Sequence, residues 1–402
     1  VGPIFYLTAR GTTRTAAENA LAILRDTEPE LHLRSVTLTA KDKICLCETR
    51  ECTPEACPYA NGYYARIKGA LWDVLDVPCL TAETLQEYAE RHTVCPFELG
   101  LDSSLWSDVI IGDYNYLFDP VVHLVRFFES AGDYIFLVDE AHNLPGRARE
   151  MHSAALTKTS FYEAKKLLGK GKSSLKNALT KVNDVFIEWR HRAEEETAAR
   201  DGRFGKTFFL KERSEEFDHL LNRLCEPLEA WLDDHREPDE THTALLQLYF
   251  DVRAWLRVAD TFDDHFVLQI TASGSEVRAA QLCLDPSAFL ADSFALGRAA
   301  VLFSATLAPA SYYKDLCGVP EARAVALRSP FPAGNQGLFC IGNVSTRYKD
   351  RDASLAIVEE SLATMVRARC GNYLAFFPSY AYMEQAYAQF KEHCPEINCI
   401  KQ

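Results

Sequence analysis

Short apolar runs separated by helix-patterned segments constrain this chain more than any other feature of its sequence. Runs of strand length occur at residues 4–7, 35–39, 108–111 and 134–138, and an amphipathic helical pattern occupies 16–24. Strands that are apolar on both faces are typical of parallel sheets covered by helices on both sides. The sequence therefore predicts an α/β fold built on a parallel sheet.

Two segments interrupt this alternation. Residues 41–97 carry cysteines, prolines and two short helical patterns, whereas residues 151–260 are helical and highly charged. We predict that both are insertions in one α/β domain. The parts assigned to that domain are residues 1–40, 98–150 and 261–309, the last with strands expected at 265–271, 278–284 and 299–303.

A second α/β unit is predicted for residues 310–402, with strands at 337–341 and 372–376. The chain starts with Val1 directly before an apolar run and stops after another strand-like run at 397–400. We expect it to be a fragment of a longer protein.

The composition suits an ordinary globular protein, with 48% hydrophobic and 25% charged residues. No apolar run reaches the roughly 18 to 20 residues of a membrane span, and no basic and apolar leader opens the chain. We therefore expect a cytoplasmic protein without a membrane partner. The formal charge of -14 argues against a protein that coats nucleic acid through its bulk charge.

The sharpest local signal is an apolar strand that ends in two adjacent acids. Residues 134–138 lead into Asp139 and Glu140, with His142 two positions later. Strand ends meet at the carboxyl edge of a parallel sheet, where α/β folds bind ligands, so this pattern favours nucleotide hydrolysis. Asp139 is expected to hold Mg²⁺, Glu140 to deprotonate the attacking water, and His142 to sense the nucleotide state. The alternative is a strand followed by a solvated acidic turn.

A second strand ends in small hydroxyl side chains. The apolar run 301–303 leads into Ser304 and Thr306. Hydroxyls at that edge can hydrogen-bond the acidic pair and report whether the terminal phosphate is present. The motif is weak alone, because any strand end can carry it.

The glycine-rich loop that cradles phosphates is missing from the chain. Such a loop needs Gly, four residues, and then Gly-Lys-Ser or Gly-Lys-Thr between a strand and a helix. Two partial matches begin at Gly171 and Gly205, but Lys166 and Arg200 stand where the first Gly belongs. We interpret both as loop residues and expect the phosphate loop to precede Val1 in the parent protein.

The chain has thirteen cysteines, and an odd number without a leader disfavours a disulfide framework. Cys45, Cys52, Cys57 and Cys95 have spacers of six, four and 37 residues. Four thiolates can hold Zn²⁺ or an iron–sulfur cluster, and the absence of short zinc-knuckle spacers favours the cluster. Cys47 competes with Cys45 for the first position, and free buried thiols are the remaining alternative.

Together these segments resemble the DinG/XPD family of iron–sulfur superfamily-two DNA helicases, especially its bacterial DinG-like branch. The resemblance spans nearly the whole chain, and the combination of motifs is more specific than any one of them. It rests on seven segments. Residues 6–12 are similar to motif Ia, residues 52–59 and 95–99 to the family's two cysteine segments, and residues 113–120 to the segment before the acidic box. Residues 139–142 are similar to motif II, residues 304–306 to motif III, and residues 375–380 to the first motif of the second motor domain.

The resemblance implies a RecA-like P-loop motor domain with a 4Fe-4S insertion (41–97) and a helical arch insertion (151–260), followed by a second RecA-like motor domain (310–402). ATP hydrolysis with Mg²⁺ would drive 5′-to-3′ movement along single-stranded or forked DNA in repair or replication. The protein would be a nucleoid-associated bacterial monomer.

Site residues follow from the same resemblance. Cys45, Cys52, Cys57 and Cys95 would hold the cluster. Thr8 and Arg10 would touch the DNA backbone, and Tyr116 would lie near the strand path. Because the phosphate loop and the late arginine motif are absent, we expect activity from the parent protein and not from this chain alone.

The second insertion opens with a lysine-rich stripe suited to phosphate contact or to a solvated helix face. It comprises Lys158, Lys165, Lys166, Lys170, Lys172, Lys176 and Lys181, against the single acid Glu163. Two other functions stay open: a zinc- or cluster-stabilised DNA-binding module without unwinding activity, and a helicase-related exonuclease.

Overall fold

The structure is a computed structural model that describes residues 2–9, 11–169, 173–199, 206–237 and 239–401. The contacts within the chain divide it into a first unit, Val1–Ala324, and a second unit, Val325–Gln402. Each unit has its own hydrophobic clusters. In the described part of the chain, no helix is both long and apolar enough to span a membrane.

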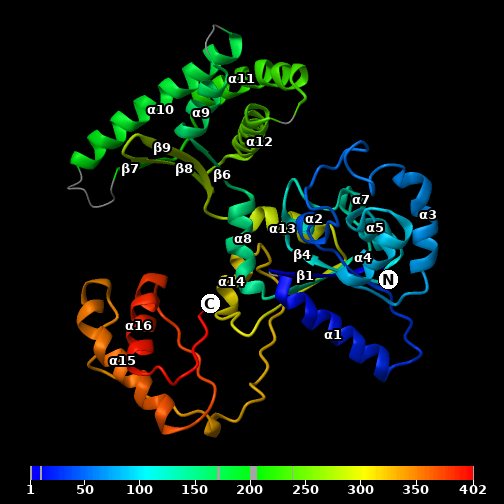
Figure 1. The fold of residues 1–402 in the computed structure, drawn as a ribbon, viewed down its shortest axis with the longest axis vertical. Coiled ribbons are helices and arrows are strands. Elements are labelled where there is room, and N and C mark those ends of the chain that lie inside the picture. Colours follow the sequence, from blue (N-terminus) through cyan, green and yellow to red (C-terminus); the bar gives the residue numbers. More distant parts are fainter. Residues whose placement is uncertain (1, 10, 170–172, 200–205, 238, 402) are drawn as a thin grey trace. The chain divides into compact units, whose positions relative to one another are not determined.

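A six-stranded parallel sheet lies in the first unit, and it confirms the predicted α/β fold (Figure 1). Its order is β10-β5-β1-β4-β2-β3, and each neighbouring pair is parallel. The carboxyl ends of its strands therefore meet at one edge. The strands are β1 (Ile4–Thr8), β2 (Ser35–Thr37), β3 (Cys79–Leu80), β4 (Val109–Asp113), β5 (Ile135–Asp139) and β10 (Ala299–Phe303).

Other elements cover both faces of this sheet, as expected for parallel strands whose side chains are apolar on both faces. Ala17 and Leu21 of α1 pack against Val109 and Ile111 on one face. Phe5 and its neighbours enter the main core on the other face. The remaining elements of this domain are α1 (Gly11–Thr27), α6 (Asn115–Phe118), α7 (Val125–Phe128), η2 (Ala141–Asn143), α8 (Leu144–Met151), α13 (Ser287–Ala295) and α14 (Ala310–Leu316).

The cysteine-rich insertion shares the main core with the sheet. Ile67 and Leu85 of this segment belong to the same cluster as Phe5 and Phe136. Its strand β3 pairs with β2 and so forms one edge of the parallel sheet, a role that the sequence did not predict. Its helices are α2 (Lys41–Ile44), α3 (Tyr63–Val74) and α4 (Ala82–His92), followed by α5 (Pro96–Ser103) and η1 (Ser104–Trp106).

The helical insertion extends further along the chain than the sequence predicts. Its own sheet is antiparallel with the order β6-β9-β8-β7. The strands are β6 (Ala154–Thr157), β7 (Thr207–Leu210), β8 (Phe266–Ser273) and β9 (Glu276–Cys283); the helices are α9 (Lys158–Leu167), α10 (Ser174–Ala199), α11 (Glu215–Asp234) and α12 (Glu240–Thr261).

Two of these strands, β8 and β9, fall in the range 261–309 that we assigned to the parallel domain. They form a hairpin around Gly274, whose φ of 61° suits a tight turn. Buried and less buried residues alternate along β8, as expected for an antiparallel strand with one face on a core. The insertion therefore runs from β6 to β9.

The second unit contains two main helices, α15 (Arg351–Ala368) and α16 (Tyr380–His393), with short η3 (Ala333–Asn335) and η4 (Tyr348–Asp350). The strands predicted at 337–341 and 372–376 are absent from its described residues, and so is any strand at 397–400. Phe339 and Phe376 are 91% and 86% exposed. These apolar runs have no strand beside them in the described part of the unit, so the ladder that would make them strands is not formed. The unit also begins at Val325 instead of residue 310, because Cys317 and Val319 pack in the core of the first unit.

Candidate active site at the strand ends

The two adjacent acids lie where β5 ends. Asp139 is the last residue of the strand, and Glu140 has the left-handed conformation, with φ 50° and ψ 41°. This conformation is uncommon for a residue other than Gly and costs about 1–3 kcal/mol. Asn143 holds it in place, since its backbone N–H and its side-chain amide donate to the Glu140 carbonyl over 2.9 and 3.3 Å. Strain of this kind is typical of functional sites.

The side chains of β5 and β10 meet in a hydrogen-bonded cluster. The Ser304 hydroxyl donates to Glu140 Oε2 over 3.1 Å, and its oxygen lies 2.7 Å from His142 Nδ1. His142 Nδ1 is also 3.3 Å from Glu140 Oε2. Thr306 joins through its backbone N–H, which donates to Ser304 Oγ over 3.2 Å. The predicted contact between the hydroxyl motif and the acidic pair is therefore present.

Two tyrosines hold Asp139, and the sequence did not predict either contact. The Tyr6 hydroxyl donates to Asp139 Oδ2 over 3.1 Å, and the Tyr114 hydroxyl donates to the Asp139 main-chain oxygen. Asp139 Oδ1 accepts from the backbone N–H of Glu140 over 2.8 Å. Burial raises the pKa of both tyrosines, that of Tyr6 to about 12, and the Asp139 charge adds to the effect. Tyr6 reaches Asp139 because of the register in which β1 pairs with β5. The sequence alone does not give this register.

Among the six thiols of the cysteine-rich insertion, Cys47 lies near Cys45 and Cys57. Cys47 Sγ lies 3.9 Å from Cys57 Sγ, and partial burial and these neighbours raise the pKa of Cys47 to about 11, with Cys45 contributing as well. Burial lowers the pKa of Lys41, but Glu98 and, to a smaller extent, Cys52 and Cys95 raise it overall.

This arrangement gathers suitable donors without forming a finished metal site. Across the described residues, no three or more His, Cys, Asp or Glu side chains are arranged to hold a metal ion. Cys45, Cys47, Cys52, Cys57 and Cys95 are all free thiols, and none of them is fully buried. Soft sulfur donors on an irregular loop suit zinc or iron–sulfur chemistry.

The residues predicted to contact DNA are less accessible than expected. Thr8 is fully buried, and its hydroxyl donates to the Gly112 carbonyl over 3.4 Å, so it does not present a hydroxyl to a DNA strand. Tyr116 is 7% exposed and packs against Gly112. Arg10 lies outside the described residues. Neither Thr8 nor Tyr116 presents an exposed side chain in this conformation.

The lysine stripe is partly engaged with the protein itself. Lys158 Nζ donates to the Ser275 carbonyl over 3.1 Å, and Lys176 Nζ donates to the Gly169 carbonyl over 2.6 Å. Lys166 and Lys181 are exposed. Lys170 and Lys172 lie outside the described residues, as do Gly171 of the first partial phosphate-loop match and Gly205 of the second. Lys206 and Thr207 of the second match are described, and Thr207 begins β7.

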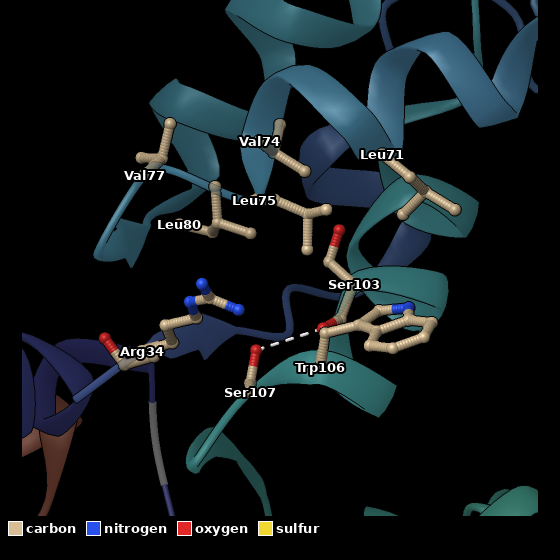
Figure 2. A pocket seen from close by; sticks show the side chains of 10 residues that line it. Arg34, Leu71, Val74, Leu75, Val77, Leu80, Ser103, Trp106 and Ser107 are labelled. Atoms are coloured by element: carbon tan, nitrogen blue, oxygen red, sulfur yellow. Dashed lines mark hydrogen bonds between the residues drawn. The ribbon is translucent and has the colours of Figure 1, made fainter. Parts of the chain in front are cut away.

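A cavity of about 20 Å³ lies between α3, β3 and η1 (Figure 2). The Ser103 hydroxyl is buried without a hydrogen-bond partner, and Figure 2 shows it directed toward Leu75. This space is enough for a single water molecule and far too small for a nucleotide. The strand ends of the parallel sheet remain the candidate active site.

Comparisons with known proteins show similarity to DNA helicases. The DEAD_2 family model matches residues 26–161, which include the cysteine-rich insertion and the acidic pair. The chain is 25% identical over 376 residues to the general transcription and DNA repair factor IIH helicase subunit XPD of Schizosaccharomyces pombe, covering 76% of this chain and 48% of the relative. It is 23% identical over 414 residues to the XPD/RAD3 subunit of Saccharomyces cerevisiae, covering 84% and 52%.

Other relatives match over shorter stretches. A regulator of telomere elongation helicase 1 homolog from Anopheles gambiae is 27% identical over 157 residues, 36% of this chain and 16% of the relative. The solved structure "XPD_Helicase" superposes with a TM-score of 0.54 at 16% identity, covering 96% of this chain and 66% of that one, which shows the shared fold. The chain thus spans about half the length of the XPD relatives that it matches.

Proposed function

Because the chain belongs to the XPD/DinG-type family of superfamily-two helicases, we propose that the protein carrying it is an ATP-dependent DNA helicase of repair or replication. The proposed direction of movement is 5′ to 3′ along single-stranded DNA, and forked DNA is the proposed substrate. The protein is proposed to work as a monomer associated with the bacterial nucleoid.

The observation that carries this proposal is the cluster of Glu140, His142 and Ser304 at the ends of β5 and β10. Glu140 is the proposed general base, with its carboxylate held on one side by the Ser304 hydroxyl. A base fixed in this way can orient and deprotonate a water molecule without first reorganising. His142 and Thr306 also contact the Ser304 hydroxyl. A displacement of β10 by the nucleotide would therefore change the position of the Glu140 carboxylate.

Asp139 is the proposed magnesium-binding residue. Its carboxylate is half-buried at the strand end and offers the hard oxygen donors that Mg²⁺ prefers. A single carboxylate is sufficient, because Mg²⁺ in nucleotide sites takes its other ligands from water and phosphate. When bound, the ion neutralises charge on the phosphates.

The phosphate cradle is proposed to come from a part of the protein outside this chain. Among the described strands, none pairs with the outer edge of β10, and Val301 in that strand is 51% exposed. An apolar strand with an open edge is a site for another strand. We propose that the strand preceding the phosphate loop pairs there, beside Ser304 and Glu140.

Cys45, Cys52, Cys57 and Cys95 are proposed to hold a 4Fe-4S cluster. The support is the type of donor, the placement of three thiols on one irregular loop, and the position of Cys95 at the start of α5. Backbone N–H groups of Phe97 and Glu98 lower the pKa of Cys95, but burial outweighs them and raises it overall. A cluster would stabilise the thiolate form instead.

The test of the proposed function is hydrolysis of ATP by the full-length protein, with and without single-stranded DNA. Glu140→Gln should keep ATP and DNA binding while turnover falls by at least about 100-fold, because the general base is removed. Glu129→Gln, at an exposed acid away from the strand ends, is the matched control and should hydrolyse ATP normally. Near-normal turnover of Glu140→Gln would refute the proposal. Duplexes with a 5′ or a 3′ single-stranded tail test the direction of movement.

A further inference from the structure

The ring of Tyr6 extends along the parallel sheet toward the end of β5. In the sheet, Tyr6 is paired with Leu137, and Phe303 is paired with Asp139. Residues two apart on a strand share a face, so Tyr6, Asp139 and Phe303 lie on the same face of neighbouring strands. The rings of Tyr6 and Phe303 meet edge to face, with centroids 5.9 Å apart. The ring of Tyr6 is thus fixed by its neighbours before its hydroxyl makes any contact.

The hydroxyl of this fixed ring reaches one oxygen of Asp139. It donates to Oδ2 over 3.1 Å, while the backbone N–H of Glu140 donates to Oδ1 over 2.8 Å. One donor on each oxygen sets the rotation of the carboxylate plane. Each oxygen keeps a further lone pair, and the side chain is only partly buried. The carboxylate is therefore oriented and still open to a ligand.

The Tyr6 hydroxyl acts as a donor throughout the physiological range. A phenol has an ordinary pKa of about 10, so it is protonated near neutral pH. The Tyr6 hydroxyl therefore donates to Asp139 and does not compete for a cation. Tyr6 contributes to the orientation of the Asp139 carboxylate.

We infer that Tyr6 is a positioning residue that orients the Asp139 carboxylate for the divalent ion of a bound nucleotide. This inference rests on the proposed function, because it assigns Asp139 to that ion. Tyr6 itself touches neither the ion nor the nucleotide. Its effect is expected on metal affinity before any chemical step.

The experiment measures binding and not turnover. Mn²⁺ replaces Mg²⁺ in the full-length protein with ADP present, and electron paramagnetic resonance reports the free ion during a titration. Tyr6→Phe keeps the ring and removes only the donor, so Mn²⁺ affinity should fall about three- to tenfold, as for one lost hydrogen bond. Its thermal unfolding midpoint should stay near that of the wild type.

Tyr134→Phe is the matched control, because it removes a tyrosine hydroxyl that donates to the Phe127 carbonyl over 2.9 Å and makes no contact with Asp139. It should leave Mn²⁺ affinity within about twofold of the wild type. Equal losses of affinity in both variants, or none in Tyr6→Phe, would overturn the inference while leaving the proposed function intact. Failure of the wild type to bind ADP with Mn²⁺ would overturn the proposed function, and the inference with it.

Discussion

Ser304 connects the two strand ends more directly than any other side chain described at the site. Its hydroxyl donates to Glu140 Oε2 and lies 2.7 Å from His142 Nδ1. Replacing it with Ala removes both contacts at once and leaves the Glu140 carboxylate without this donor. The base then samples more orientations, so a smaller fraction of molecules is ready to react.

Ser304→Ala should therefore lower the turnover of ATP in the full-length protein about tenfold, the equivalent of one net hydrogen bond of 1–1.5 kcal/mol, with little change in nucleotide affinity. Steady-state kinetics separate the two effects. Ser293→Ala is the matched control, because that hydroxyl donates only to the Phe289 carbonyl in α13. A fall in affinity with unchanged turnover would contradict the role given to Ser304.

The sequence could predict the members of this cluster but not all of its supports. Asp139, Glu140 and Ser304 follow apolar runs, and parallel strands bring such ends to one edge. The contact of Tyr6 with Asp139 depends on strand register and on the position of the ring, and no local sequence pattern specifies either. The partner of Thr8 is likewise absent from the local pattern, since its hydroxyl donates to the Gly112 carbonyl across the sheet.

The loop that carries Cys45, Cys47, Cys52 and Cys57 has little helix or strand to hold it. The short helix α2 ends at Ile44, just before this loop, and α3 begins after it at Tyr63. Bound metal would supply cross-links that this segment otherwise lacks. The structure places Cys47 next to Cys57, so Cys47 is a fifth candidate for the four positions of the proposed cluster.

Cys95→Ser in the full-length protein, purified without oxygen, should lose its iron and become more sensitive to proteolysis within residues 41–97. Cys47→Ser should keep iron and sulfide, since Cys45 is the proposed first ligand. Iron analysis and the visible absorption spectrum provide the measurement. Loss of iron from Cys47→Ser with retention in Cys45→Ser would show that the first ligand is Cys47.

His152 ends helix α8 and stacks on Phe289 of α13, with ring centroids 4.0 Å apart and planes 9° from parallel. Burial lowers its pKa below the usual value, although Asp119 and the Phe118 carbonyl act in the opposite direction. The unfolded chain therefore takes up the proton more readily than the folded protein. This histidine supports folding above its unfolded pKa of about 6.5, and that support is lost as the pH falls through its folded value.

Residues 1–402 should thus unfold at a lower temperature at pH 5.5 than at pH 7.5, and His152→Phe should reduce the difference, because Phe keeps the stacked ring without a titrating group. Thermal melts at the two pH values measure this. His32→Phe, at an exposed histidine, should keep the wild-type pH dependence. An unchanged acid effect in His152→Phe would exclude this histidine as its source.

The positions of helices and strands were easier to predict than the pairing of the strands. The run at 299–303 is strand β10, and one of the two short helical patterns predicted within 41–97 is α3 (Tyr63–Val74). The strands at 265–271 and 278–284 also form, but in the sheet of the helical insertion. Local patterns specify extended backbone, whereas pairing depends on which strand lies alongside. At 337–341 and 372–376 no described strand does, and the ladder is missing.

The division of the whole chain into two units has a direct consequence for stability. The three hydrophobic clusters of the first unit contain no residue beyond Val319, and the two clusters of the second unit contain none before Leu355. Packing of buried apolar side chains provides most of the favourable free energy of folding. The first unit should therefore fold without the second.

A chain that ends at Ala324 should keep the thermal midpoint of the first unit within about 2 °C, because no core contact is removed. A chain that ends at Gly297 is the informative control: it lacks β10 and the fully buried Cys317, and it exposes the edge of β5. Each buried apolar side chain lost costs about 1.5–3 kcal/mol, so this shorter chain should unfold at a much lower temperature or aggregate. Calorimetry of the three proteins distinguishes the cases. A large loss of stability on truncation at Ala324 would mean that the second unit contributes to the core of the first.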